Sequence, residues 1–292
     1  MNVVFNPVIR ENFKARWISI ISKLLPRFRG DWLLYCRLFS LLPQDKRTVN
    51  VEIAVHDKRL FSVDFNICDP PQYTMVKRAR YDLGSALAVW FLLKQGDVFI
   101  DVGANHGYLS AVAAQKVGDS GLVISLEPNL EAFKQLVKRR IPNVFPLNFA
   151  ISDSNRGRLT VKKPFYRQTT SGFCEEGTGV SKTTVDYIYE KFNKPSVKFL
   201  KVDTEGMELL ILLGAKKLLM EKSPYVMLEL EERHVRRYGY EISDVLELMG
   251  KLGYNWHYRI DNRQASVSSS EFIKDSEILF SKEELVPGKF NV

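Results

Sequence analysis

Glycine and polar residues are concentrated in one short segment, residues 98–108, whose composition suits the binding of a small ligand. An apolar run in this segment ends at Asp101. Three residues that suit a tight turn follow: Gly103, Asn105 and Gly107. A helix of small residues is predicted to begin at Tyr108. Because glycine lets the backbone turn sharply and lets a ligand come close, a strand, a turn and a helix N-terminus in this order predict a site for an anionic or polar small molecule.

A second acidic residue follows the next predicted strand. That strand, residues 121–126, ends at Glu127. A carboxylate at the tip of the second parallel strand can accept hydrogen bonds from both hydroxyls of a ribose. Enzymes that bind a dinucleotide require G-x-G-x-x-G at the turn. The chain has Asn105 and Tyr108 at the second and third glycine positions, which disfavours an NAD-linked dehydrogenase.

From residue 84 onward the sequence alternates between predicted strands and predicted helices. The strands are residues 98–101, 122–126, 144–151, 159–162, 197–202, 225–230, 256–260 and 278–280. The helices are residues 84–93, 108–116, 130–139, 184–192, 207–219 and 243–252. Residues 164–182, rich in Thr, Ser and Gly, are predicted to form a loop. The alternation predicts an α/β fold with a mostly parallel sheet, right-handed crossovers and helices on both faces.

Ligands bind open α/β sheets beyond the carboxyl ends of the strands, so the polar residues at those ends are candidate site residues. After the turn, the candidates in chain order are Glu127, Pro128, Asn129, Ser152, Asp153, Asp203, Glu205, Glu229, Glu231 and His234. We expect these side chains to gather at one edge of the sheet.

Four motifs in this region carry a family resemblance. They are Asp-Val-Gly-Ala-Asn-His-Gly-Tyr at 101–108, Leu-Glu-Pro-Asn at 126–129, Ala-Ile-Ser-Asp at 150–153 and Lys-Val-Asp-Thr-Glu-Gly-Met-Glu at 201–208, followed by Leu-Leu-Gly-Ala at 212–215. In this order they resemble the FkbM family of S-adenosylmethionine (SAM)-dependent methyltransferases. The resemblance implies the class I methyltransferase fold, a Rossmann-like, mostly parallel seven-stranded sheet with helices on both faces. It also implies SAM as cofactor and methyl transfer to a hydroxyl oxygen of a natural product, sugar or lipid-linked glycan.

The resemblance gives each candidate a task toward SAM. Asp101 is expected to order the turn or to accept from the methionine ammonium, and the turn from Gly103 to Tyr108 is expected to approach the amino-acid end. Glu127, with Pro128 and Asn129 beside it, is expected to hold the ribose. Asp153, next to Ser152, is expected either to accept from the adenine amine or to serve as a turn acid.

The chemical step needs help from the protein, because a hydroxyl is a poor nucleophile without a base or a metal ion. Asp203, at the end of its strand, could be a base, a metal ligand or an orienting acceptor. His234 could be a general base, since histidine is neutral near pH 7, or an ordinary loop histidine. Asp203, Glu205 and Glu231 could together hold a divalent ion, but acids at strand ends also serve cofactors and helix caps, and we expect no metal.

The rest of the chain is assigned to an N-terminal extension, residues 1–75, ahead of a methyltransferase domain, residues 76–292. The extension is predicted to contain helices near residues 13–25 and 32–42 and a hairpin of strands 48–55 and 60–67. Most of the net charge of +8 lies in residues 1–50, which contain nine Lys and Arg residues but only three Asp and Glu residues. Basic helices with apolar residues among them suit contact with an anionic membrane surface or packing on the catalytic domain.

The composition of the chain indicates which partners and which cellular compartment to expect. The three cysteines, Cys36, Cys68 and Cys174, have no metal-binding spacing and fit a reducing compartment. We expect a cytoplasmic protein that could associate with a membrane, with a homo-oligomer left open. An RNA methyltransferase and a non-catalytic module that keeps the fold are the alternatives. No RNA-binding module signature accompanies the basic charge, so no nucleic acid partner is expected.

Overall fold

A computed structural model describes residues 48–55, 58–66, 83–162, 173–260, 265–267 and 276–285 of the chain. The chain divides into two compact units, Met1–Leu83 with Val292 and Gly84–Asn291. The helices predicted within residues 13–42 lie outside the described residues.

The first unit contains the predicted β-hairpin. Strand β1 (Thr48–Val55) pairs antiparallel with β2 (Lys58–Asn66), and the register shifts between Ile53 and Ala54. Alternation of apolar and polar residues in both strands predicted this pairing, and the structure confirms it.

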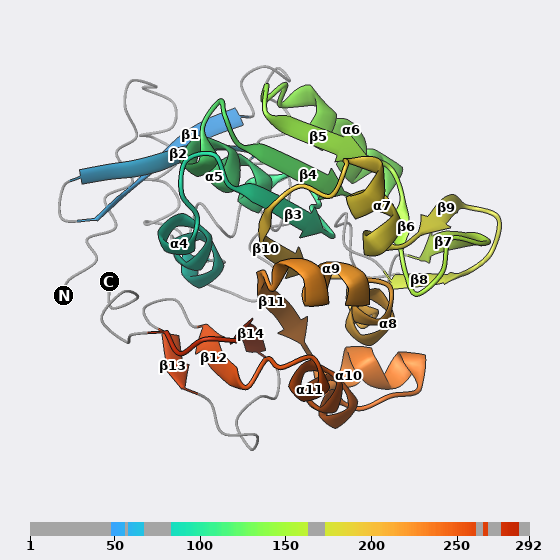
Figure 1. The fold of residues 1–292 in the computed structure, drawn as a ribbon. Helices are drawn as coiled ribbons and strands as arrows, with labels where there is room; N and C mark the ends of the chain where they lie inside the picture. Colours follow the sequence, from blue (N-terminus) through green and yellow to red (C-terminus); the bar gives the residue numbers. More distant parts are fainter. Residues whose placement is uncertain are drawn as a thin grey trace, which may run out of the picture. The chain divides into compact units, whose positions relative to one another are not determined.

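An eight-stranded sheet forms the centre of the second unit (Figure 1). Its strand order is β13-β12-β14-β11-β10-β3-β4-β5. Five strands run parallel: β5 (Val144–Leu147), β4 (Leu122–Leu126), β3 (Val98–Val102), β10 (Val197–Val202) and β11 (Tyr225–Leu230). Antiparallel pairing joins β14 (Ser276–Ser281), β12 (Trp256–Ile260) and β13 (Ala265–Val267) to β11. The fold class is confirmed, and β13 adds one strand to the expected seven.

Helices connect the parallel strands. They are α4 (Leu83–Leu92), α5 (Tyr108–Val117), α6 (Leu130–Lys138), α7 (Val185–Lys191), α8 (Glu208–Leu213), α9 (Lys216–Lys222), α10 (Glu232–Val235), the 3-10 helix η2 (Arg236–Tyr238) and α11 (Ile242–Lys251). The chain steps one way across the sheet from β3 through α5 to β4, and the opposite way from β10 through α9 to β11. Right-handed crossovers therefore place these two helices on opposite faces. The strands are apolar and fully buried at Val102, Leu126 and Val202, as a doubly covered parallel sheet requires.

Two predicted elements are divided in the structure. The helix predicted at residues 207–219 breaks into α8 and α9 around Gly214, where a Cβ would lie 2.3 Å from the carbonyl oxygen of Ser152. The chain packs too closely there for a continuous helix with a side chain at that position. The strand predicted at residues 144–151 divides into β5 and β6 (Ala150–Ile151). Asn148 between them donates from Nδ2 to the carbonyl oxygens of Glu127 and Pro128.

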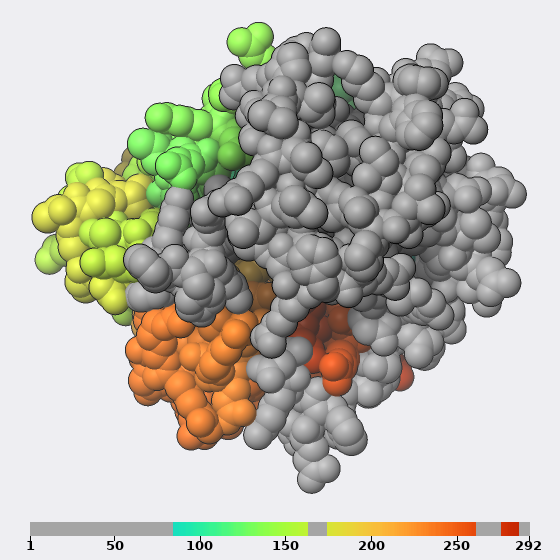
Figure 2. All heavy atoms as spheres, turned by 180° about the vertical axis from the view of Figure 1, so that it is seen from behind, coloured from blue at the N-terminus to red at the C-terminus, as the bar shows by residue number. Residues whose placement is uncertain are grey.

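A second, smaller sheet follows in the order β6-β9-β7-β8. Besides β6 it contains β7 (Arg158–Lys162), β8 (Phe173–Glu176) and β9 (Val180–Thr183). The prediction of a loop over residues 164–182 is wrong where β8 and β9 form, because pairing with β7 and β6 gives these short polar segments their backbone hydrogen bonds. Figure 2 shows this sheet (yellow-green) and the segment after β11 (orange) reaching the surface seen from behind.

Candidate functional site

The predicted site residues meet where the strand order of the large sheet reverses. Val102 at the end of β3 pairs with Leu126 of β4 on one side and with Val202 of β10 on the other. The turn after β3 therefore begins between Glu127 and Asp203. This is the topological switch point, where open α/β sheets bind their ligands.

The turn itself depends on residues with left-handed backbone conformations. Gly103 has φ of 82°, and a Cβ there would lie 1.8 Å from the carbonyl oxygen of Asp203. Gly107 has φ of 75°, and its Cβ would lie 2.4 Å from Cδ1 of Leu136 in α6. Asn105 between them is also left-handed, with φ of 51°. At Gly103 the backbone therefore approaches its neighbour more closely than any other residue type would permit, whereas a Cβ at Gly107 would displace the end of the Leu136 side chain.

Glu127 ties this turn to the end of the second strand. Its Oε2 accepts from the backbone N–H of Asn105 at 2.7 Å, and its Oε1 accepts from that of Asn129 at 2.7 Å. Burial raises the pKa of Glu127 to about 7, against the effect of the two amide hydrogen bonds. Each carboxylate oxygen has a second acceptor position, so the side chain shapes the turn and can still accept from a ligand hydroxyl.

Asp101 faces inward from β3. Its carboxylate accepts from Ser110 Oγ in α5 at 2.5 Å, and that hydroxyl lies 2.8 Å from Ser125 Oγ in β4. Burial raises the pKa of Asp101 to about 6, while the hydrogen bond from Ser110 opposes the shift. This hydrogen bond joins β3 to the helix that follows the turn, and both tasks expected of Asp101 stay predictions.

Three further candidates lie beside the turn. Tyr108 is half-buried and begins α5, and Pro128 is half-buried after β4. Asn129 caps α6, since its Oδ1 accepts from the backbone N–H of Glu131 at 2.9 Å and of Ala132 at 3.3 Å. The side chain of Asn129 therefore has a structural task that the sequence motif did not predict.

Ser152 and Asp153 follow the short strand β6. The Ser152 backbone N–H donates to the carbonyl oxygen of Thr183, and its hydroxyl donates to Asp153 Oδ1 at 3.0 Å. Ser152 is buried and Asp153 is exposed. The carboxylate of Asp153 is exposed at this edge, and both tasks expected of it, toward the adenine amine or in a turn, stay predictions.

Asp203 lies among charged groups at the end of β10. Nζ of the buried Lys201 contacts its Oδ2 at 3.2 Å and contacts Glu277 Oε1 in β14 at 2.9 Å. Partial burial raises the pKa of Asp203, but the Lys201 ammonium and a hydrogen bond from Glu229 outweigh it, so this pKa lies below its ordinary value. The charge of Asp203, followed by burial, raises the pKa of Glu229 well above its ordinary value. The pKa values of the two neighbouring carboxyls are therefore shifted in opposite directions, downward for Asp203 and upward for Glu229.

The loop after Asp203 is held by a buried glutamate. Glu208 Oε1 accepts from the backbone N–H and the hydroxyl of Thr204, both at 3.1 Å, and from the backbone N–H of Gly206 at 3.2 Å. A Cβ at Gly206 would lie 2.4 Å from the carbonyl oxygen of His234, and φ there is 117°. The backbone of the loop therefore lies in close contact with the backbone at His234.

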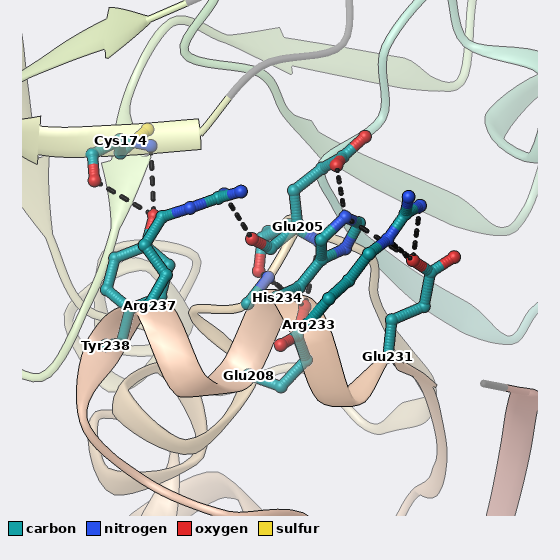
Figure 3. A network of polar contacts seen from close by, with 10 residues as sticks. Cys174, Glu205, Glu208, Glu231, Arg233, His234, Arg237 and Tyr238 are labelled. Atoms are coloured by element: carbon teal, nitrogen blue, oxygen red, sulfur yellow. Dashed lines mark hydrogen bonds and ion pairs between the residues drawn. The ribbon is translucent and has the colours of Figure 1, made fainter. Parts of the chain in front are cut away.

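His234 is buried in α10 and faces two glutamates (Figure 3). Its Nε2 lies 3.1 Å from Glu205 Oε2 and 3.4 Å from Glu231 Oε2. Burial lowers the pKa of His234, and the two carboxylates, which act in the opposite direction, do not outweigh it. The imidazole is therefore neutral at pH 7. Arg233 also binds Glu231, with its Nε 2.6 Å from Oε2.

The order of these features along the chain matches a family model, described as the methyltransferase FkbM domain, over residues 101–256. This match covers more than half of the chain and spans every candidate residue. The chain belongs to the FkbM methyltransferase family. The resemblance to this family that the sequence motifs indicate is confirmed.

Solved structures similar to this FkbM chain are distant. An FkbM methyltransferase from Methylobacillus flagellatus is 16% identical, with a TM-score of 0.43, and the match covers 72% of this chain but 52% of that chain. A fibrillarin from Aeropyrum pernix with natively bound SAM is 13% identical over 68% of this chain and 73% of that chain, with a TM-score of 0.40. A SAM-dependent O-methyltransferase from Thermotoga maritima is 14% identical over 84% and 79%, with a TM-score of 0.40. No curated protein matches the chain.

The residues of this FkbM chain fit SAM by their chemistry. SAM carries a positive sulfonium, and the turn is bordered by three acids, Asp101, Glu127 and Asp203. The absent side chain of Gly103 leaves the turn close to Asp203.

Within the described residues, no helix is long and apolar enough to cross a membrane.

One group of side chains has the spacing of metal ligands. Among the described residues, Glu229, Glu231 and His234 have ligand atoms that all lie within 4.8 Å of one another. This group differs from the set considered from sequence, since it uses Glu229 in place of Asp203 and His234 in place of Glu205. Each member already has a protein partner: Glu229 contacts Asp203, Glu231 contacts Arg233, and His234 contacts Glu205.

Sequence reasoning missed three residues of this site. Lys201 and Glu208 stood in the quoted motif without a task, and Glu229 was not recognised as the partner of Asp203. A signal was available for Lys201, because a lysine inside an otherwise apolar strand is expected to be buried and therefore paired.

Proposed function

We propose that this FkbM methyltransferase transfers the methyl group of SAM to a hydroxyl oxygen of a natural product, a sugar or a lipid-linked glycan. The observation that carries the proposal is the placement of the glycine turn between Glu127 and Asp203 at the switch point of the sheet. A donor bound along this edge would have carboxylates at both of its ends. The acceptor class follows from the family resemblance.

The binding roles follow from the side chains. Ionised Glu127 would accept from the ribose hydroxyls, and the turn at Gly103 to Gly107 would approach the amino-acid end of SAM. Asp153, exposed after β6, would accept from the adenine amine. SAM supplies a methyl group that its sulfonium has already activated, so the protein has to align the acceptor oxygen and take up one proton.

Two residues are proposed to act on the acceptor. Asp203 would orient the hydroxyl by accepting its hydrogen bond. If His234 donates from Nε2 to Glu205, the lone pair lies on Nδ1, and Nδ1 would take the proton of the hydroxyl. The carboxylates of Glu205 and Glu231 would then stabilise the imidazolium, since each lies within 3.4 Å of Nε2.

The test uses the full chain with SAM labelled in its methyl group. Extracts of metabolites, glycans and RNA from the source cells are incubated with it separately, and products are separated and weighed by mass spectrometry. We expect a small-molecule or glycan product that is heavier by one labelled methyl group on oxygen. Label on nitrogen or carbon, or label found only in RNA, would contradict the proposal. Glu127→Gln should lower the yield of product about tenfold or more at limiting SAM, whereas Glu247→Gln, an exposed change in α11, should keep it.

A further inference from the structure

A buried lysine lies among carboxylates in the central sheet. Lys201 is 1% exposed, and its Nζ contacts Asp203 Oδ2 at 3.2 Å and Glu277 Oε1 at 2.9 Å. Burying an ammonium costs free energy unless it is paired and hydrogen-bonded. A fully buried lysine at the end of a core strand therefore indicates a task that an apolar residue could not perform there.

The strand register places these charges on one face of the sheet. Lys201 in β10 is paired with Asp101 in β3 and with Met227 in β11. Side chains alternate between faces along a strand, so the residue two places further on shares the face. The charged residues on this face, in order across the sheet, are Asp101, Lys201 with Asp203, Glu229 and Glu277.

Asp203 and Glu229 form a carboxyl pair in this row. They follow the paired residues Val202 and Leu228 on adjacent parallel strands, so their side chains lie next to each other on one face, and each carboxyl shifts the pKa of the other. Two carboxyls in contact do not both ionise readily, so the pair holds one proton. The ammonium of Lys201 contacts an oxygen of Asp203, which favours the charge on Asp203 and the proton on Glu229.

We propose that Lys201 is a positioning residue that fixes the negative charge of this pair on Asp203 and leaves the proton on Glu229. The strand end beside Gly103 then presents one carboxylate of constant charge. Glu277 holds the lysine from the opposite side, so that the ammonium stays in place. The part of this inference that concerns catalysis rests on the proposed function.

The consequence concerns the task of Asp203. A carboxylate that already receives hydrogen bonds from an ammonium and from a carboxylic acid is a weak base. Asp203 therefore orients the acceptor and complements the positive charge of the donor, and it does not remove the proton. This decides between the two non-metal tasks that the sequence left open for Asp203.

The test is a pH titration of the full chain by NMR, with ¹³C in the carboxyl carbons of Asp and Glu. Asp203→Asn and Glu229→Gln assign the two signals. We expect Asp203 to titrate below the ordinary range of an aspartate and Glu229 to titrate above that of a glutamate. In Lys201→Met the midpoint of Asp203 should rise by about one unit or more. A signal of protonated Asp203 at about pH 6 in the unmodified protein, or an unchanged midpoint in Lys201→Met, would overturn the proposal.

Other charged groups that face Asp203 must be separated from the effect of Lys201. They are Asp101, Glu127, Glu229, His234 and Glu277. Lys201→Arg keeps the charge and should keep the midpoint of Asp203 low. If Lys201→Met fails to fold by circular dichroism, Glu277→Gln serves instead, because it loosens the lysine and should raise the same midpoint by a smaller amount. An unchanged midpoint in a folded Glu277→Gln would then overturn the proposal.

Calorimetry with SAM on the same proteins separates this inference from the proposed function. Product formation is measured on the same proteins. The SAM affinity of Lys201→Met should stay within about threefold of that of the unmodified protein, whereas its rate of methyl transfer should fall by about tenfold or more. A purely structural lysine would weaken both together, and that result would contradict a positioning role. Failure of the unmodified protein to bind SAM would contradict the proposed function and leave the charge assignment standing.

Discussion

Gly103 and Asp203 lie so close together that a Cβ at position 103 would fall 1.8 Å from the carbonyl oxygen of Asp203. The binding turn after β3 and the charged end of β10 are therefore one structural unit. The backbone N–H of Asp203 also donates to the carbonyl oxygen of Val102 at 3.0 Å. A change in the turn must displace the residue that is proposed to orient the acceptor.

Gly103→Ala tests this contact. The substitution places a methyl group against backbone and forces a residue with φ of 82° into a strained conformation. We expect a loss of about 1–3 kcal/mol in the free energy of unfolding and no measurable SAM binding by calorimetry. Gly250→Ala is the matched control, because a Cβ there meets nothing within 4 Å and alanine favours a helix by about 1 kcal/mol. A Gly103→Ala protein that binds SAM normally would contradict the account of the turn.

The pKa of Glu127 predicts how SAM binding depends on pH. Burial raises that pKa to about 7, so the carboxylate loses its proton as the pH rises through neutrality. Ionised Glu127 accepts from hydroxyls and attracts a cation, so SAM affinity should rise between about pH 6 and pH 8. Burial also raises the pKa of Asp101 to about 6, so ionisation of Asp101 should contribute to the increase in SAM affinity at the lower end of this pH range.

Glu127→Gln isolates the contribution of that carboxylate. The variant should bind SAM about tenfold or more weakly and should lose the part of the pH dependence near neutrality. Calorimetry at several pH values measures both effects. An affinity that stays constant with pH in the unmodified protein would contradict the role of Glu127.

Glu208 is predicted to stabilise the loop between Asp203 and α8. Glu208→Ala removes the acceptor of two backbone amides, the half-buried one of Thr204 and the buried one of Gly206. An unsatisfied buried donor costs about 1–3 kcal/mol, so we expect a loss of about 2–4 kcal/mol in urea unfolding. Glu247→Ala, which removes an exposed ion pair with Lys251, should change stability by no more than about 0.5 kcal/mol. Equal effects of the two variants would show that Glu208 has no special structural role.

His234→Gln separates proton uptake from donor binding. The side chain keeps a neutral polar group but loses the imidazole base, so transfer should fall by about 10²–10⁴-fold while SAM affinity changes little. His257→Gln, in β12, controls for the loss of a histidine. If transfer by His234→Gln equals that of the unmodified protein, His234 is not the base.

Chelation tests the group Glu229, Glu231 and His234. Their ligand atoms are close enough for a divalent ion, but each is already bound to another side chain of the protein. We therefore expect transfer to persist after dialysis against EDTA, measured by incorporation of labelled methyl. Loss of transfer that Mg²⁺ or Mn²⁺ restores would show that an ion replaces those protein contacts.

Much of the fold could be predicted because its signals are local. The runs before Asp101 and Glu127 are apolar and end at acids, so the strands and the switch-point position of the turn followed from the sequence. In the small sheet the strand at residues 159–162 was predicted, but β8 and β9 were missed, since they have polar sequences and form through pairing with distant segments. The break at Gly214 likewise depends on a close contact with Ser152 that no local pattern encodes.

The sequence predicted which residues lie at one edge of the sheet, but it did not predict what their side chains contact. Residues at strand ends, such as Glu127 and Asp203, could be placed at one edge from topology alone. The task of Asp203 depends on Lys201 and Glu277, which come from positions 76 residues apart in the chain. Likewise, the capping by Asn129 and the hydrogen bonds of Glu208 depend on side-chain direction, which residue spacing does not determine.

The most direct test of the central claim is a crystal structure of the full chain grown with SAM. We predict that the donor lies at the carboxyl edge of the sheet, with its ribose hydroxyls on Glu127, its amino-acid end at the turn from Gly103 to Gly107, and its methyl group toward Asp203. Donor found at the other edge of the strands, or a turn without donor at saturating concentration, would contradict the account.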